Sequence, residues 1–135
     1  MKLLFNHVSN FEYRATEKTK IGTELEEGEK TGETGESILV KVCSESGDDD
    51  STVERTLDEI KDISNQVGVK SLVLFPWAHL SQDLASPDAA EEMMEEMKKR
   101  LEGEGFEVLK APFGWYKEWK LESKGHPVSV LSRAV

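Results

Sequence analysis

The sequence predicts an α/β domain in which a mixed sheet carries two main helices on one face. Three observations lead to this fold class. Segments with strand and helix character follow one another in the order strand, strand, strand, helix, strand, helix, strand, strand. The run Ser71–Phe75 is apolar throughout, as expected for a central strand buried on both faces. No repeat or linker divides the 135 residues, so we expect a single domain with its own core.

The first 36 residues are expected to form a hairpin followed by a loop. Lys2–Val8 and Phe11–Arg14 have strand character, and the polar pair Ser9-Asn10 between them has turn propensity. From residue 16 to 36, Glu, Lys, Thr and Gly dominate, which indicates a solvated, mobile loop without chemistry of its own. His7, at the end of the first run, is interpreted as a structural histidine.

The next segments predict a strand and the first helix. Ile38–Cys43 has strand character, and its lone cysteine is expected to be a core residue of a protein in a reducing compartment. The acidic segment 45–50 lacks the glycine and terminal glutamate of a calcium loop, so no metal site is predicted. Ser51 and Glu54 suggest a capping box, and Gly68 ends the helix. Its apolar face contains Val53, Leu57, Ile60, Ile63 and Val67.

The segment Pro76–Ser81 follows the expected central strand and contains a histidine. Ligands of α/β sheets collect where central strands end, so His79 is a candidate binding residue. A capping or buried polar role for His79 remains the alternative.

The second helix is expected to begin with Ser86 as its N-cap and Pro87 as its first residue, and to end before Gly103. Its apolar face contains Ala90, Met93 or Met94, Met97 and Leu101, and we interpret the methionines as core rather than as a docking groove. Three further strands are expected, at Phe106–Leu109, Trp115–Leu121 and Val128–Arg133.

The stretch Ala111–Lys117 is the most distinctive in the chain, because it contains a proline, a glycine, three aromatic residues and a lysine. Gly114 keeps the turn open, and Tyr116 and Lys117 would present a phenol and an ammonium group side by side. One interpretation is the floor of a binding site. The other is a loop held in place by aromatic packing.

The net charge of −10 argues against binding of nucleic acid by general electrostatics. Residues 1–104 carry 12 basic and 24 acidic side chains, whereas residues 105–135 carry 5 basic and 3 acidic ones, so an anionic ligand is expected at the C-terminal third. No apolar stretch has the length of a membrane span, and the start of the chain runs directly into strand-like sequence. We therefore expect a cytoplasmic protein without membrane contact.

The residues that could carry chemistry are few. There is no nucleophilic elbow and no phosphate-binding glycine loop, and the three histidines lack the spacing of zinc ligands. Tyr116, Lys117 and His79 remain, and they can orient and polarise a substrate. Such groups favour a site in which part of the substrate, or a held water, reacts.

Three strings stand out: Phe75–Ser81, Lys110–Lys117 and Lys124–Pro127, with Leu131–Arg133 beyond them. Together they resemble the N-terminal editing domain of archaeal threonyl-tRNA synthetases, and the likeness covers nearly the whole chain. The resemblance implies a D-aminoacyl-tRNA deacylase-like fold, a homodimer, no cofactor, and hydrolysis of L-seryl-tRNA(Thr). It also implies that the terminal ribose 2′-hydroxyl of the tRNA assists the attacking water. Residues 1–135 would then be a single editing domain, excised from a longer synthetase or free-standing.

The resemblance also implies roles for individual residues. Lys117 would fix and polarise the ester or water, Tyr116 would position the substrate, and His79 would line the pocket. His7 and His126 fall in matching strings without an assigned step. The expected substrate-binding residues are Pro76, Trp77, Ala78, Phe113, Gly114 and Trp115.

Two positions depart from the family pattern, and two other functions remain open. Val130 stands where the family pattern His-Pro-x-x-Glu-Leu-Ser-Arg has its glutamate, so a carboxylate contribution there is lost or supplied elsewhere. Trp115 replaces a tyrosine, which preserves stacking but not a hydroxyl hydrogen bond. The alternative functions are D-aminoacyl-tRNA deacylation and a non-catalytic appendage that binds tRNA ends or dimerises a synthetase.

Overall fold

The computed structural model describes residues 1–135 as one seven-stranded mixed sheet with two α-helices. Strands β3, β4 and β5 run parallel, and β1 pairs antiparallel with β2, β3, β6 and β7. The mixed-sheet fold predicted from the sequence is therefore confirmed. The elements are β1 (Lys2–Lys18), β2 (Thr31–Thr34), β3 (Ser37–Cys43), α1 (Asp50–Val67), β4 (Ser71–Pro76), α2 (Pro87–Gly103), β5 (Glu107–Lys110), β6 (Trp115–Ser123) and β7 (Val130–Ala134).

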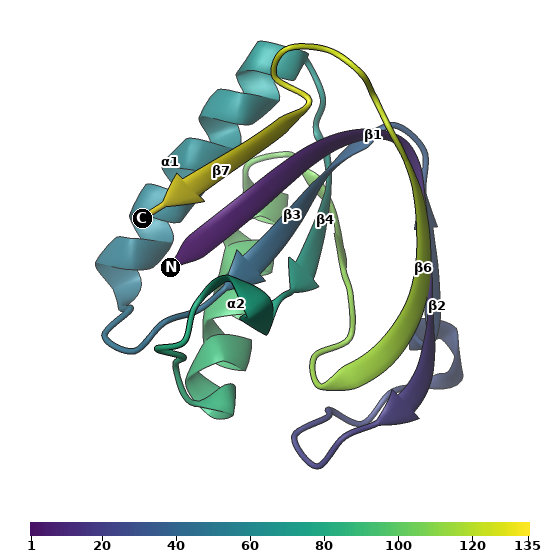
Figure 1. Ribbon diagram of the computed structural model, residues 1–135, viewed down its shortest axis with the longest axis vertical. Coiled ribbons are helices and arrows are strands. Elements are labelled where there is room, and N and C mark those ends of the chain that lie inside the picture. Colours follow the sequence, from purple (N-terminus) through teal and green to yellow (C-terminus); the bar gives the residue numbers. More distant parts are fainter.

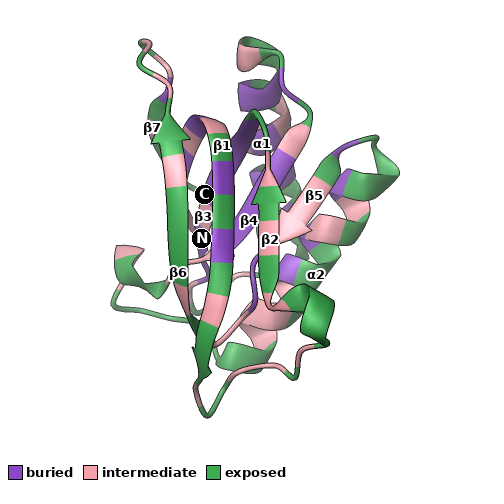
Figure 2. Ribbon diagram, turned by 90° about the vertical axis from the view of Figure 1, so that its right-hand side faces the viewer, coloured by how far each residue is buried: buried purple, intermediate pink, exposed green.

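Both helices cover the same face of the sheet (Figure 1). Ile60 of α1 and Met97 of α2 are fully buried there against sheet residues such as Phe5 and Leu74. Figure 2 shows the buried residues along β1 and along the helix surfaces that face the sheet. The methionines of α2 therefore belong to the core, as the sequence predicted.

A smaller core fills the opposite face, where β6 curls over the sheet. Val73 and Phe75 of β4 point into it, whereas Leu72 and Leu74 point toward the helices. The ring of Trp119 on β6 packs edge-on against Phe75 with 5.2 Å between centroids. Strand β4 is thus buried on both faces, which explains its uninterrupted apolar sequence.

The predicted hairpin at Ser9-Asn10 is wrong, because β1 is one strand of 17 residues. The register against β6 shifts between Val8 and Asn10, so the polar pair lies in a β-bulge. The bulge places Phe11 in the smaller core together with Val8, whereas Phe5 faces the helices. The first half of β1 pairs with β3 and β7, and the second half pairs with β2 and β6. Pairing with these distant strands keeps β1 extended, although Ser9-Asn10 has turn propensity.

The predicted loop at residues 16–36 is also partly wrong. It contains the end of β1, the short 3₁₀ helix Glu27–Glu29 and strand β2. Strand β2 pairs with Phe11–Arg14 through backbone hydrogen bonds, although none of its side chains is apolar. Its stability comes from the neighbouring strand, which the local composition does not reveal.

The helix ends follow the sequence signals with one correction. The N-cap of α1 is Asp49, whose carboxylate accepts from the Thr52 amide at 3.1 Å while the Thr52 hydroxyl accepts from the Asp49 amide. The predicted Ser51 cap is therefore wrong, because the aspartate two residues earlier takes that role. Gly68 ends α1 with φ 71°, and Ser86 caps α2 before Pro87 as predicted. Gly103, expected just beyond α2, is its last residue.

The core facing the helices can be tested with Ile60→Ala. The side chain is fully buried, so its truncation is expected to lower the free energy of unfolding by about 2–5 kcal/mol in urea titrations. Asn65→Ala changes an exposed residue of the same helix and is expected to stay within about 0.5 kcal/mol of the unmodified protein. Equal effects of the two changes would contradict this core.

Candidate active site

A cavity of about 470 Å³ lies at the carboxyl ends of β3 and β4. The 3₁₀ helix Ala78–Leu80, the first turns of α2, the β5–β6 loop and the start of β6 form its walls. The structure brings together two of the three strings that the sequence singled out, Phe75–Ser81 and Lys110–Lys117, although 28 residues lie between them. No residue of the third string, Lys124–Pro127, borders the cavity. The nine predicted site residues that border it are Pro76, Trp77, Ala78, His79, Phe113, Gly114, Trp115, Tyr116 and Lys117.

Lys117 is the most constrained polar group in this cavity. Its Nζ donates to the carbonyl oxygens of Pro112 (2.9 Å) and Trp115 (2.7 Å) and lies 5.1 Å from the ring centroid of Phe75. Burial and, to a smaller extent, the charge of Lys110 lower its pKa to about 8. No carboxylate pairs with it, so the third N–H remains available to a carbonyl oxygen or a water.

His79 and Tyr116 are held less tightly. The imidazole of His79 is exposed and packs edge-on against Trp77 with 4.7 Å between ring centroids. It makes no hydrogen bond, so the alternative of a capping or buried polar histidine is wrong. Tyr116 is 64% exposed, whereas Lys117 faces Phe75, because successive side chains of a strand point to opposite faces. The phenol and the ammonium are therefore not side by side, and Tyr116 lies at the rim.

The floor of the cavity depends on two glycines in contact. Gly114 has φ 74°, and a Cβ added to it would lie 2.5 Å from the Cα of Gly22. The amide and hydroxyl of Thr19 both donate to the Gly114 carbonyl oxygen, at 3.0 and 2.6 Å. Thr19 and Ile21 consequently line the cavity. The segment expected to have no function is a wall of the site, and no local signal pairs its glycine with Gly114.

The end of β3 supplies further lining residues that the sequence analysis missed: Val42, Cys43 and Ser44. Burial raises the pKa of the Cys43 thiol, so it stays protonated and is a poor nucleophile near neutral pH. On the opposite side, Leu84 and Pro87 border the cavity at the entry to α2. The one cysteine of the lining is therefore not an activated nucleophile.

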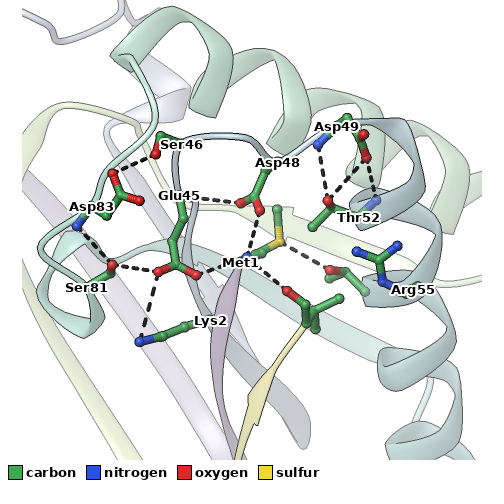
Figure 3. A network of polar contacts seen from close by, with 12 residues as sticks. Met1, Lys2, Glu45, Ser46, Asp48, Asp49, Thr52, Arg55, Ser81 and Asp83 are labelled. Carbon is green, nitrogen blue, oxygen red and sulfur yellow. Dashed lines mark hydrogen bonds and ion pairs between the residues drawn. The ribbon is translucent and has the colours of Figure 1, made fainter.

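A polar network supports the wall that carries His79 (Figure 3). The hydroxyl of Ser81 donates to Glu45 at 2.6 Å, and that of Ser46 donates to Asp83 at 2.6 Å. The other carboxylate oxygen of Glu45 lies 3.1 Å from the ammonium group of Met1. The acidic segment after β3 therefore uses its carboxylates to hold the neighbouring loop, and no group of three potential metal ligands converges anywhere in the chain.

His7 and His126 form a separate hydrogen-bonded chain with Glu36. Nδ1 of His7 lies 2.8 Å from Nε2 of His126, and Nε2 of His7 lies 2.7 Å from Glu36. Nδ1 of His126 accepts from the amide of Val128 at 3.3 Å, which assigns the proton of each neutral ring to Nε2. Neither histidine lines the cavity, and His7 has the structural role that the sequence suggested.

The two departures from the editing-domain pattern have different consequences. The ring N–H of Trp115 donates to the carbonyl oxygen of Thr23 at 2.7 Å, so the tryptophan makes a hydrogen bond of its own through the indole nitrogen. Val130 is 55% exposed on β7 and does not border the cavity.

A family model for the archaea-specific editing domain of threonyl-tRNA synthetase matches residues 1–135. The chain belongs to this family. It is 41% identical over 138 residues to a threonine–tRNA ligase of Methanopyrus kandleri, and the match covers 100% of this chain and 22% of that protein. The editing domain described here thus spans about a fifth of the length of the curated relatives it matches.

Two solved structures show the same fold over nearly their whole length. The c-Myc DNA unwinding element binding protein superposes with a TM-score of 0.75 at 12% identity, covering 100% of this chain and 99% of that one. A probable eukaryotic D-amino acid tRNA deacylase superposes with a TM-score of 0.62 at 10% identity, covering 98% of both chains. The predicted D-aminoacyl-tRNA deacylase-like fold of the editing domain is therefore confirmed. None of its helices is long and apolar enough to cross a membrane.

The glycine contact in the cavity floor predicts the effect of Gly114→Ala. Both the positive φ and the approach of Gly22 oppose a side chain, so the free energy of unfolding should fall by about 1–3 kcal/mol in urea titrations. Gly28→Ala is the matched control, because an added Cβ would contact nothing within 4 Å there. A loss no larger than that of the control would show that the two loops separate easily.

Proposed function

We propose that this editing domain hydrolyses the ester of L-seryl-tRNA(Thr). The observation that carries the proposal is the position of Lys117, an ammonium group without a carboxylate partner in a cavity lined by two of the three editing-domain strings. Membership of the editing-domain family and the deacylase-like fold support it.

In the proposed reaction a water oxygen bonds to the ester carbonyl carbon, and the bond from that carbon to the terminal ribose oxygen breaks. The free N–H of Lys117 donates to the carbonyl oxygen as negative charge develops on it, or holds the water. The water's proton passes to the departing ribose oxygen, so the products are serine and uncharged tRNA.

The water also needs a group that orients it and accepts its proton in transit. The thiol of Cys43 stays protonated, and His79 is exposed at the edge of the cavity. The adjacent 2′-hydroxyl of the terminal ribose is a suitable group, because binding of the substrate brings it to the ester. The protein then positions the reactants, and the tRNA assists its own deacylation.

Selection against threonine follows from exclusion. A pocket that selects threonine by binding its extra methyl group discriminates against serine by only about 1–3 kcal/mol. A second site is therefore needed to remove serine that has been attached in error. The close contact of Gly114 with Gly22 fixes the backbone at the floor of this cavity, and backbone yields less than side chains.

The proposal is tested by comparing hydrolysis of L-seryl-, L-threonyl- and D-aminoacyl-tRNA(Thr). L-seryl-tRNA is expected to be deacylated fastest, because its ester fits the cavity without the methyl group. Faster hydrolysis of a D-aminoacyl-tRNA would instead establish the second candidate, which the shared fold of the D-amino acid tRNA deacylase favours. Binding of tRNA without any hydrolysis would identify a non-catalytic appendage.

The same assay with a terminal 2′-deoxyadenosine tests the substrate-assisted step. Loss of this hydroxyl is expected to slow hydrolysis by about 100-fold or more, as for a lost general acid–base group. An undiminished rate would remove the 2′-hydroxyl from the mechanism.

Lys117→Met is expected to slow deacylation of L-seryl-tRNA(Thr) by well over about tenfold, because the oxyanion loses a charged donor. The protonated lysine is the active form, so kcat should fall as the pH rises through about 8. Lys117→Arg stays charged above pH 8 and should lack this fall. Lys20→Met, at an exposed lysine beside Thr19, is the control and should leave the rate unchanged.

Unfolding experiments on the same variants separate a chemical role from a structural one. The unfolded chain keeps this proton up to the ordinary pKa of 10.5, whereas the folded protein releases it near 8. The stability of the unmodified protein should therefore rise relative to Lys117→Met between about pH 8 and 10.5. A constant difference over that interval would contradict the lowered pKa of Lys117.

A further inference from the structure

A second ammonium group without a carboxylate partner lies beside the cavity. Lys41 extends from β3 on the face opposite the helices, and its Nζ lies 4.3 Å from the ring centroid of Trp77 and 5.9 Å from that of Trp119. It makes no ion pair and no hydrogen bond with any residue of the chain. We call Lys41, Trp77 and Trp119 the lysine–tryptophan ledge.

The absence of a partner for Lys41 is unusual in a chain with a net charge of −10. The half-buried Lys110, for comparison, pairs with Glu91 at 2.9 Å and with Glu95 at 3.0 Å. Among the half-buried lysines, Lys41 and Lys117 alone lack a carboxylate. Burial without a counterion disfavours the charged form and lowers the pKa of Lys41. An incoming anion would compensate this loss of hydration.

The ledge is continuous with the candidate active site. Trp77 and Trp119 both border the cavity, and Phe75 lies between them and Lys117, with its ring centroid 5.8 Å from Trp77 and 5.2 Å from Trp119. An aromatic cluster therefore separates the two unpaired ammonium groups. The cavity volume suits one nucleoside with its aminoacyl group, so the next nucleotide must lie outside it.

These contacts lead to an inference that rests on the proposed function. We propose that the lysine–tryptophan ledge binds the nucleotide that precedes the terminal adenosine of the tRNA. Lys41 pairs with the phosphodiester of that nucleotide, and Trp119, which is 38% exposed, offers its indole to the base. Aromatic stacking combined with a local cation is how proteins hold single-stranded nucleic acid. An acidic domain can thereby grip the tRNA end without a general basic surface.

The competing explanation is that Lys41 only packs against the indoles. Lys70 provides the matched comparison, because its Nζ lies 4.8 Å from the ring centroid of Phe106 near the amino end of β4, the end opposite the cavity. Because Lys70 lies away from the cavity, its replacement should not change the affinity for the ligand.

The test measures equilibrium binding of two non-hydrolysable probes. One is adenosine with serine attached to its 3′ position through an amide, and the other is the trinucleotide CCA ending in the same group. The unmodified protein should bind the trinucleotide at least about tenfold more tightly than the nucleoside. Lys41→Met should remove most of this gain and leave binding of the nucleoside unchanged. Trp119→Leu should also reduce the gain, whereas Lys41→Arg and Lys70→Met should preserve it.

Salt dependence gives a second measurement that a packing role would not change. The affinity for the trinucleotide should fall as salt is added, and a plot of its logarithm against the logarithm of the salt concentration gives a slope. That slope should be steeper by about 0.7 in the unmodified protein than in Lys41→Met, because one phosphate contact is lost in the variant. Equal affinities of the unmodified protein for the two probes would overturn the proposal, as would a Lys41→Met variant that weakens both probes equally. If Lys41→Met fails to fold, the comparison of the two probes on the unmodified protein decides alone.

The outcome is independent of whether the domain hydrolyses seryl-tRNA. If the trinucleotide binds more tightly than the nucleoside, if this difference depends on Lys41, and if the domain has no deacylase activity, the nucleotide-binding role of the ledge is supported and the proposed function is rejected. Deacylation without such a gain would do the reverse.

Discussion

The burial of β4 on both faces is the constraint on which the rest of the structure depends. Leu72 and Leu74 anchor the helices on one side, and Val73 and Phe75 anchor the curled β6 on the other. A strand packed in this way cannot shift, because one residue of slippage would exchange both sets of contacts. The segment after Pro76 therefore starts from a fixed point, and the cavity forms where it meets the start of β6.

The charge distribution makes that cavity distinctive. Most lysines of this acidic chain pair with carboxylates at the surface, where such pairs contribute little to stability. Around Phe75 the arrangement is reversed, because Lys41 and Lys117 are half-buried beside aromatic rings and have no carboxylate. An ammonium group with few competing partners in a poorly hydrated place interacts strongly with a negative charge that develops nearby. The same feature supports both the proposed chemistry and the proposed grip on the tRNA.

The sequence predicted two of the segments that line the candidate site, but it did not predict the other lining residues. Phe75–Ser81 and Ala111–Lys117 contain the unusual residue types, and the rule that ligands gather at strand ends placed the first string. Thr19, Ile21 and the end of β3 carry no comparable signal, since their role comes from contacts with residues distant in the sequence. For Tyr116 the sequence was misleading in the opposite way. Tyr116 and Lys117 are adjacent in the sequence, but their side chains point to opposite faces of the strand.

By itself the sequence determined the two helices, the buried central strand, the fold class and the pair of strings around the cavity. Periodicity, capping residues and apolar runs act over a few residues, so they survive in a single chain without coordinates. Only the tertiary structure decided that β1 continues as one strand past Ser9-Asn10, that β2 exists, and that Gly22 contacts Gly114. In each case the deciding energy comes from backbone pairing or close packing with a distant segment, which can override a weak local preference.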